Sequence, residues 1–277
     1  MKYVAKTILV LLMVTMMIAI TACSENESDS SLDDSMIEEA YTEPAVVYKD
    51  IFSQSGTHIW YFIRYPQPED GASFDFGRSA ELMGLYVFQD GKVTIYDDPE
   101  LGLLDENGDN ITLDMLSKMS DEEVIKNVKQ WHRNGYDKFI SKYETGDAIG
   151  SIKEGTTYIE PQACNIEYFV TLDETGNSTA SEWMKVDNYQ MFDIVGNGMY
   201  VVDDVYGYVK TEYVLGLNLD ADIIEGEVYE STYRGVLWRA GMGVEWDEGF
   251  VTRDDFDYIE LNSPEDDGVS IYEEEEE

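Results

Sequence analysis

Residues 85–96 read LYVFQDGKVTIY, two runs of aromatic and β-branched residues on either side of Asp90-Gly91. Both positions of a two-residue hairpin loop need a positive φ, and the Asp-Gly pair is well suited to it. The stretch therefore predicts an antiparallel hairpin with strands at 85–89 and 92–96. The earlier run 57–65, THIWYFIRY, is equally rich in strand-forming residues and predicts a further strand.

A capped helix is expected after the hairpin. Ser120-Asp121-Glu122-Glu123 matches a capping box, in which the Ser and Glu side chains satisfy free backbone amides. Apolar residues then recur every three to five positions, typical of a helix with one buried stripe: Val124, Ile125, Val128, Trp131, Tyr136, Phe139, Ile140 and Tyr143. Asn134-Gly135 is expected to end or bend this helix. A shorter helical turn is expected at 113–119.

Beyond Gly146 the pattern is that of strands. Residues 166–172 and the segment after Ser178 flank the polar stretch 173–177, which predicts a second hairpin. Further strand-like runs occupy 191–195, 199–209, 213–217, 228–239 and 256–261. The predicted fold class is α+β, sheet-rich, with antiparallel hairpins and one main helix region. It is expected as one unit or as two lobes, an N-terminal strand-hairpin-helix lobe (45–145) and a C-terminal β-rich lobe (146–264).

Composition excludes several functions. The 277 residues carry a formal net charge of −40, and nucleic-acid binding needs clusters of Lys and Arg that are missing here. Two His and two Cys are too few for a Cys/His zinc cage. A hydrophobic fraction of 43% is too high for a wholly disordered chain.

The first 22 residues have the layout of a signal peptide. Lys2 and Lys6 precede the mostly apolar residues 7–20, which are short for a membrane span of roughly 20 apolar residues. Ile20-Thr21-Ala22-Cys23 resembles the lipobox of bacterial lipoproteins, with Ile20 where Leu is usual. The resemblance implies cleavage before Cys23, a diacylglyceryl group on its thiol, and anchoring at the extracytoplasmic face of the cell membrane. The alternatives are an uncleaved anchor helix and an ordinary secreted protein.

Both ends of the expected mature chain are acidic. Residues 23–44 hold eight acidic and no basic residues and predict a flexible tether, and 265–277 hold eight more and predict a solvated tail. The segment between them, 45–264, keeps a net charge of −26. With Cys23 lipidated, Cys164 is the one remaining cysteine, and we expect it to be a small buried hydrophobic residue.

The body of the chain carries a second, looser resemblance. The stretch from 91–96 through 116–123 is similar to a strand-then-capped-helix module of uncharacterised lipoproteins of Gram-positive bacteria. This resemblance implies a location and an architecture but no activity.

Motifs for metal chemistry fail on spacing. An EF-hand loop starting at Asp105 would need Gly at its sixth position and Glu at its twelfth, where this chain has Asn110 and Leu116. The segments 105–110 and 173–177 therefore predict polar turns. The acidic runs 203–204 and 254–257 are expected at solvated sheet edges or loops.

Motifs for catalysis are also missing. The chain has no Gly-x-Ser-x-Gly elbow, phosphate loop or dinucleotide fingerprint. His58 and His132 are therefore expected to be structural. Carboxylates are so numerous that a suitably spaced pair for a glycoside hydrolase carries no information.

We therefore expect a non-catalytic, lipid-anchored surface protein without a cofactor that binds a protein partner or an envelope component. A solute-binding lipoprotein of a transporter and an envelope glycan hydrolase using Asp or Glu remain alternatives, and cations could stabilise so acidic a fold. Aromatic residues that could stack on sugars or anchor a partner are Trp60, Tyr61, Tyr65, Trp131, Trp183, Tyr206, Tyr208, Trp238 and Trp246.

Overall fold

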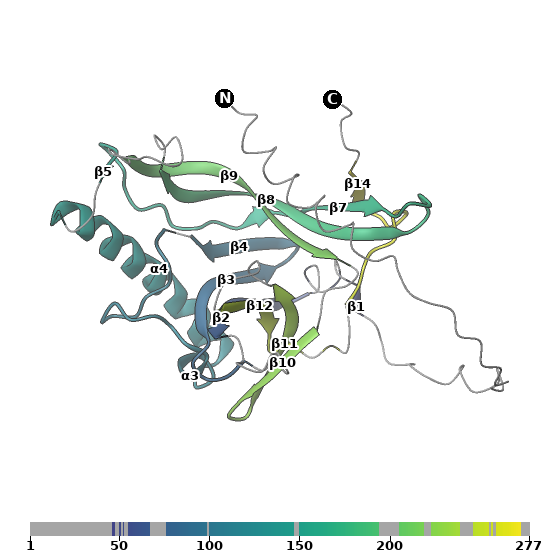
Figure 1. The fold of residues 1–277 in the computed structure, drawn as a ribbon, viewed down its shortest axis with the longest axis horizontal. Coiled ribbons are helices and arrows are strands. Elements are labelled where there is room, and N and C mark those ends of the chain that lie inside the picture. The colour runs from purple at the N-terminus through teal and green to yellow at the C-terminus, as the bar shows by residue number, and fades with distance from the viewer. Residues whose placement is uncertain are drawn as a thin grey trace, which may run out of the picture. The chain divides into compact units, whose positions relative to one another are not determined.

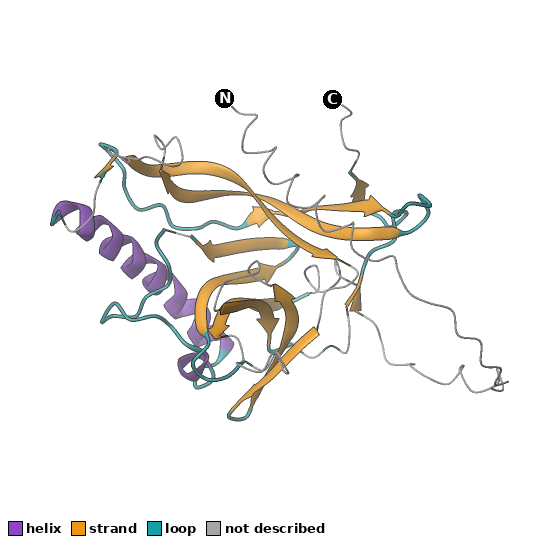
Figure 2. Cartoon of the chain, in the orientation of Figure 1, coloured by secondary structure: helices purple, strands orange, loops and turns teal. Residues whose placement is uncertain are grey.

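The computed structural model describes residues 46–47, 50, 52, 55–66, 76–98, 100–146, 150–193, 205–218, 223–238, 246–254, 256 and 259–272. They belong to one compact unit, residues 43–277. This unit contains two large sheets and one long helix, so the predicted α+β class is confirmed (Figures 1 and 2). None of the helices in these ranges is long and apolar enough to cross a membrane.

The larger sheet has seven strands, and every neighbouring pair in it is antiparallel. In spatial order they are β10 (Ile223–Val228), β11 (Ser231–Trp238), β12 (Trp246–Thr252), β2 (Thr57–Pro66), β3 (Glu81–Gln89), β4 (Lys92–Asp97) and β6 (Cys164–Asn165). The predicted Asp90-Gly91 hairpin is confirmed as β3–β4, with φ of 52° and 72° at the two turn residues.

The smaller sheet has five strands in the order β14 (Val269–Ile271), β7 (Glu167–Leu172), β8 (Thr179–Asp193), β9 (Val205–Asn218) and β5 (Ser151–Ile152). The predicted second hairpin is confirmed as β7–β8. A parallel pair of short strands, β1 (Val46–Val47) and β13 (Ile259–Glu260), forms a third sheet.

Two helices are described, α3 (Leu113–Leu116) and α4 (Asp121–Glu144). The predicted capping box at the start of α4 is confirmed, because Ser120 Oγ accepts from the Glu123 amide while the Glu123 carboxylate accepts from the Ser120 amide. The expected end or bend at Asn134-Gly135 is wrong, since α4 runs through it. A Cβ at Gly135 would lie 2.4 Å from the Gly102 carbonyl oxygen, so glycine here lets a loop pack against an intact helix.

The elements form three layers, with the seven-stranded sheet in the middle. On one face, Tyr61, Ile63 and Leu85 pack against Leu113 and Val128 of the helices. On the other face, a second core joins the strands to the five-stranded sheet; it includes Trp60, Tyr86, Phe88, Val93, Ile95, Phe250, Tyr168, Met184 and Val186. Strand β2 is thus buried on both faces, which explains its continuous apolar run. Figure 1 shows β8 and β9 on the side of β4 away from β2.

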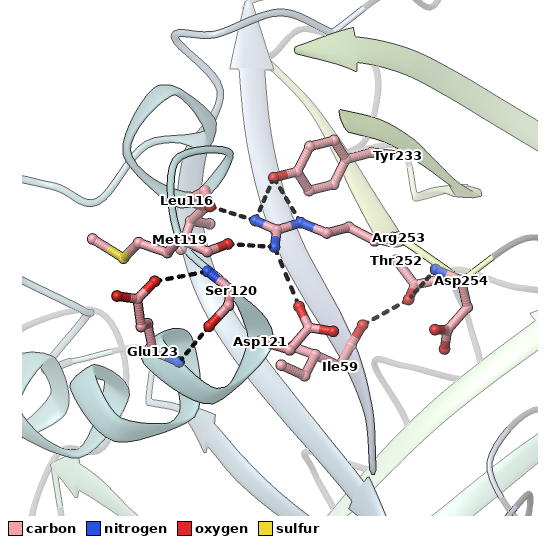
Figure 3. A network of polar contacts seen from close by, with 10 residues as sticks. All are labelled: Ile59, Leu116, Met119, Ser120, Asp121, Glu123, Tyr233, Thr252, Arg253 and Asp254. Carbon is pink, nitrogen blue, oxygen red and sulfur yellow. Dashed lines mark hydrogen bonds and ion pairs between the residues drawn. The ribbon is translucent and has the colours of Figure 1, made fainter. Parts of the chain in front are cut away.

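An arginine joins the helices to the middle sheet (Figure 3). Arg253 follows β12, and its guanidinium donates to the carbonyl oxygens of Leu116 and Met119, at 2.9 Å for Met119. It also donates to the Tyr233 hydroxyl at 2.9 Å and lies 3.2 Å from Asp121 Oδ1. These bonds satisfy carbonyls around the end of α3 and fix the α3–α4 connection on the sheet.

Three further sequence predictions differ from the structure. The run 228–239 is not one strand, because the chain turns at Tyr229, with φ of 59°, between β10 and β11. The expected solvated tail 265–277 contains β14, which adds to β7. The sheets do not follow the expected lobe boundary at 145/146, since β2 pairs with β12.

The turn at Tyr229 contains no Gly or Asn, so the sequence does not indicate it. Its ring lies 4.2 Å from the Arg78 guanidinium carbon, and its hydroxyl donates to Asp114 at 2.5 Å. A positive φ costs free energy at a tyrosine, so these contacts on α3 and on the segment before β3 hold the turn.

Candidate functional site

A groove of about 590 Å³ opens where the chain leaves the five-stranded sheet for the seven-stranded one. Strand β7 begins at Glu167, opposite Lys185 of β8. The residues before it cross to β6, which pairs with β4. The groove is the space left beside β8, and it is lined by Lys92, Ile159, Glu160, Pro161, Gln162, Ala163, Cys164, Asn165, Glu167, Lys185, Asp187, Asn188, Tyr189, Lys210 and Glu212.

The strand period explains which side chains reach this groove. Along β8, Met184, Val186 and Asn188 are buried, whereas Asp187 and Tyr189 are exposed. Successive residues of a strand point to opposite faces, so the odd-numbered residues here form the face that no layer of the described residues covers. Tyr189, with 51% of its surface exposed, is the large aromatic residue of this face beside the groove.

Ion pairs hold most of the charges across the groove floor. Lys210 Nζ lies 2.5 Å from Asp187 Oδ2, and Lys185 Nζ lies 2.7 Å from Glu212 Oε2. The hydrogen bonds to these carboxylates raise the pKa of both lysines above the usual value. Lys92 also lines the groove, and no ion pair is recorded for it within the described ranges. The groove thus gathers three lysines and four carboxylates, those of Glu160, Glu167, Asp187 and Glu212.

Cys164 lies in the groove wall and is half-buried, so the prediction of full burial is wrong. One side of it packs against the second core, while its thiol donates to the Gln162 carbonyl oxygen at 3.3 Å. Burial, with Asp187 nearby, raises the pKa of the Cys164 thiol. A raised pKa keeps the thiol protonated at neutral pH, so the residue is a poor nucleophile.

The two histidines lie apart from each other and from the groove. His132 on α4 is buried, with Nδ1 at 3.0 Å from the Tyr158 hydroxyl, and burial lowers its pKa to about 4. His58 on β2 has Nδ1 at 2.8 Å from Asp254 Oδ2. Its Nε2 has no hydrogen-bond partner among the described residues, so the pair lacks the hydroxyl or thiol of a catalytic triad.

The two acidic loops are turns, as predicted. The Asp105 carboxylate accepts hydrogen bonds from the amides of Asn107 and Asp109. The bond from Asp109 contributes most to holding the pKa of Asp105 below its usual value. Asp173 caps its own loop in the same way. In the part of the chain that the structure describes, three or more His, Cys, Asp or Glu residues never gather as a metal site would require.

Most of the aromatic residues named as candidate contacts are core residues. Trp60, Tyr61, Tyr65 and Trp131 are buried, and Tyr206 and Tyr208 pack under α4. Trp183 is half-buried, Trp246 is 41% exposed, and the side chain of Trp238 lies outside the described set. Cys23, the predicted lipid-attachment residue, also lies outside the described residues, as do 203–204.

Sequence reasoning missed the groove itself. Its floor comes from β8 and β9, and its wall comes from 159–165, a segment without a periodic pattern. The available signal was the alternation of β8, where polar residues on one face mark a side without a covering layer.

Comparison with protein-family models, with curated proteins and with solved structures found no match for this chain.

Proposed function

We propose that this chain is a lipid-anchored extracytoplasmic protein without catalytic activity, which holds a protein partner or another envelope component in the groove beside β8. The observation that supports binding is the uncovered face of β8 and β9, where exposed Tyr189 lies beside a groove of about 590 Å³. A pocket of some 300–1,000 Å³ is of a size that proteins use for ligands.

The residues of the groove favour binding over chemistry. Its lysines Lys185 and Lys210 are ion-paired and keep raised pKa values, so they remain protonated and are poor bases at neutral pH. Its thiol also remains protonated. A positioned tyrosine with fixed charges around it provides stacking and complementary charge for a ligand.

The membrane anchor is supported by the sequence of residues 1–23. The test is a cell-fractionation experiment comparing the natural chain with Cys23→Ala. We expect the natural chain in the membrane fraction, with its mass increased by a diacylglyceryl group, and the variant without that increase. An unmodified natural chain would overturn the anchor.

The binding site is tested by photo-crosslinking in intact cells. A benzoylphenylalanine placed at Tyr189 should yield one dominant adduct. The same probe at Glu174, an exposed residue in the β7–β8 turn, is the matched control and should not yield it. Equal adducts from both positions, or none from position 189, would overturn the groove as the binding site.

A further inference from the structure

Strand β8 is paired along only part of one edge. Its register with β9 is unbroken from Ser181 to Asp193. On the other side, its pairing with β7 stops at Lys185. No strand in the described ranges pairs with Asp187, Asn188 or Tyr189 on that side, where β6 lies near β8 but pairs with β4, and this unpaired edge lies along the groove.

The direction of the backbone groups at this edge follows from two neighbouring bonds. The N–H and C=O groups of one strand residue point to the same side, and those of the next residue point to the other side. The Val170 carbonyl accepts from the Tyr272 amide, so the backbone groups of the even residues of β7 point to β14 and those of the odd residues point to β8. Lys185 lies opposite Glu167 in the register, so the backbone groups of Lys185 point to β7. The Met191 amide donates to Asp98 Oδ2 at 2.8 Å rather than to β9. Both observations place the backbone groups of the odd β8 residues on the groove side.

Three of the backbone groups of Asp187 and Tyr189 are available to bond a ligand. The Tyr189 amide is satisfied by Asn188 Oδ1 at 2.8 Å. The amide of Asp187 and the carbonyls of Asp187 and Tyr189 have no backbone partner in the part of the chain that is described. Asp187 thus presents a donor and an acceptor side by side, the arrangement with which one residue of an antiparallel strand forms two hydrogen bonds.

We propose that the groove binds an extended polypeptide segment of the partner, which adds as a short strand to the open edge of β8 at Asp187–Tyr189. This inference rests on the proposed function and narrows its ligand to a peptide. At about 3.3 Å per residue in both strands, the three-residue edge accommodates about three residues of such a segment.

The side chains around the edge define the chemistry of the segment. Lys185, Lys210 and Glu160 are neutralised by their own ion pairs, whereas Lys92 and Glu167 line the groove without an ion pair among the described residues, so Lys92 can pair with a carboxylate of the ligand. The exposed ring of Tyr189 provides an apolar contact on the outer face. The segment is therefore expected to carry an acidic side chain toward Lys92 and an apolar one over Tyr189.

The probe is a phage-displayed library of linear octapeptides, selected against the full-length protein. The best peptide is then synthesised with a single N-methyl group at each position in turn. Strand addition predicts that methylation at alternate positions weakens binding by about tenfold or more, and that the positions between them change it by less than about threefold. Lys92→Gln should weaken binding, whereas Lys126→Gln, at an exposed lysine on α4, should not.

Amide hydrogen exchange gives an independent result. The peptide should slow exchange of the Asp187 amide, whereas the Asn188 amide, which faces β9, should change little. Selection of no peptide, equal sensitivity to methylation at every position, or an unchanged Asp187 amide would overturn strand addition. If the crosslink at position 189 persists in cells in any of these cases, the proposed function stands and only this inference fails.

Discussion

Strands β2 and β8 are both long and both central in their sheets, yet their side chains are distributed differently. In β2 the residues Trp60, Tyr61 and Ile63 are fully buried, because a layer covers each face of the seven-stranded sheet. In β8 burial alternates, because the described residues cover only one face of the five-stranded sheet. A strand covered on both faces is thus apolar throughout, whereas a strand covered on one face exposes charged residues and a tyrosine on the other. Five predictions test this contrast between covered and open faces.

The largest effect is expected for tryptophan removal. Trp60→Ala deletes a fully buried side chain that stacks on Phe250, and should lower the free energy of unfolding by about 3–5 kcal/mol in urea titrations. Trp183→Ala, on the half-open face against Tyr272, should cost about 1 kcal/mol. An equal loss of unfolding free energy in the two variants would contradict the difference between the covered and the open face.

The next effect concerns Arg253. Arg253→Met leaves the carbonyls of Leu116 and Met119 without their charged donor, and should cost about 2–4 kcal/mol. Its control is Arg64→Met, which removes a partly exposed ion pair with Glu248 and should cost less than about 1 kcal/mol. A loss at Arg253 no larger than at Arg64 would show that the guanidinium does not hold the helices on the sheet.

A third prediction concerns the joint between the two sheets. Burial raises the pKa of Asp98 to about 6. Hydrogen bonds that its carboxylate accepts from the amides of Met191, Glu100 and Leu101 lower this pKa, but by less than burial raises it. A folded pKa above the usual value of 3.8 means that the folded state holds the proton more tightly, so this contribution to stability is present at low pH and is lost as the pH rises toward 6 and beyond. Relative to Asp98→Asn, the natural chain should lose about 2–3 kcal/mol of stability between pH 4 and 7.

His132 provides the opposite slope. Its folded pKa of about 4 lies below the usual value of 6.5, so its contribution to stability is present above pH 6.5 and is lost as the pH falls toward 4. Relative to His132→Gln, the natural chain should therefore gain stability as the pH rises over this range. Unfolding measured at several pH values checks both slopes, and slopes of equal sign would contradict the assignment.

The smallest effect compares a helix cap with a surface ion pair. Ser120→Ala removes the side chain that caps α4 and should cost about 1 kcal/mol. Lys210→Met breaks an exposed ion pair with Asp187 on the open face and should leave the unfolding curve unchanged. A loss at Lys210 as large as at Ser120 would show that the open face contributes to folding rather than to recognition.

Local signals in the sequence predicted much of this fold. The Asp90-Gly91 turn and the Ser120 capping box depend on neighbouring residues alone, and both are confirmed. The Tyr229 turn could not be predicted in this way, because contacts from Arg78 and Asp114, distant in sequence, hold it. The continuous helix through Gly135 was missed for a similar reason, since the packing loop at Leu101 and Gly102 lies outside the local pattern.

The candidate site was less predictable than the fold. The lipid-attachment residue Cys23 is proposed from a local motif and stays a prediction. The groove depends on where β7 stops and where the chain crosses to β6, which is a matter of tertiary pairing. Composition could not reveal that Lys92 meets Lys185 and Lys210, because β4 lies far from β8 and β9 in the sequence.

The pairing of β2 with β12 also has a consequence for the order of events during synthesis. Ile59 accepts a hydrogen bond from Thr252, 193 positions later. The middle of the seven-stranded sheet therefore cannot close until residue 252 has been synthesised, and contacts of such long range form slowly. Until then the aromatic strand β2 has only β3 beside it, with both faces open to water or to a chaperone.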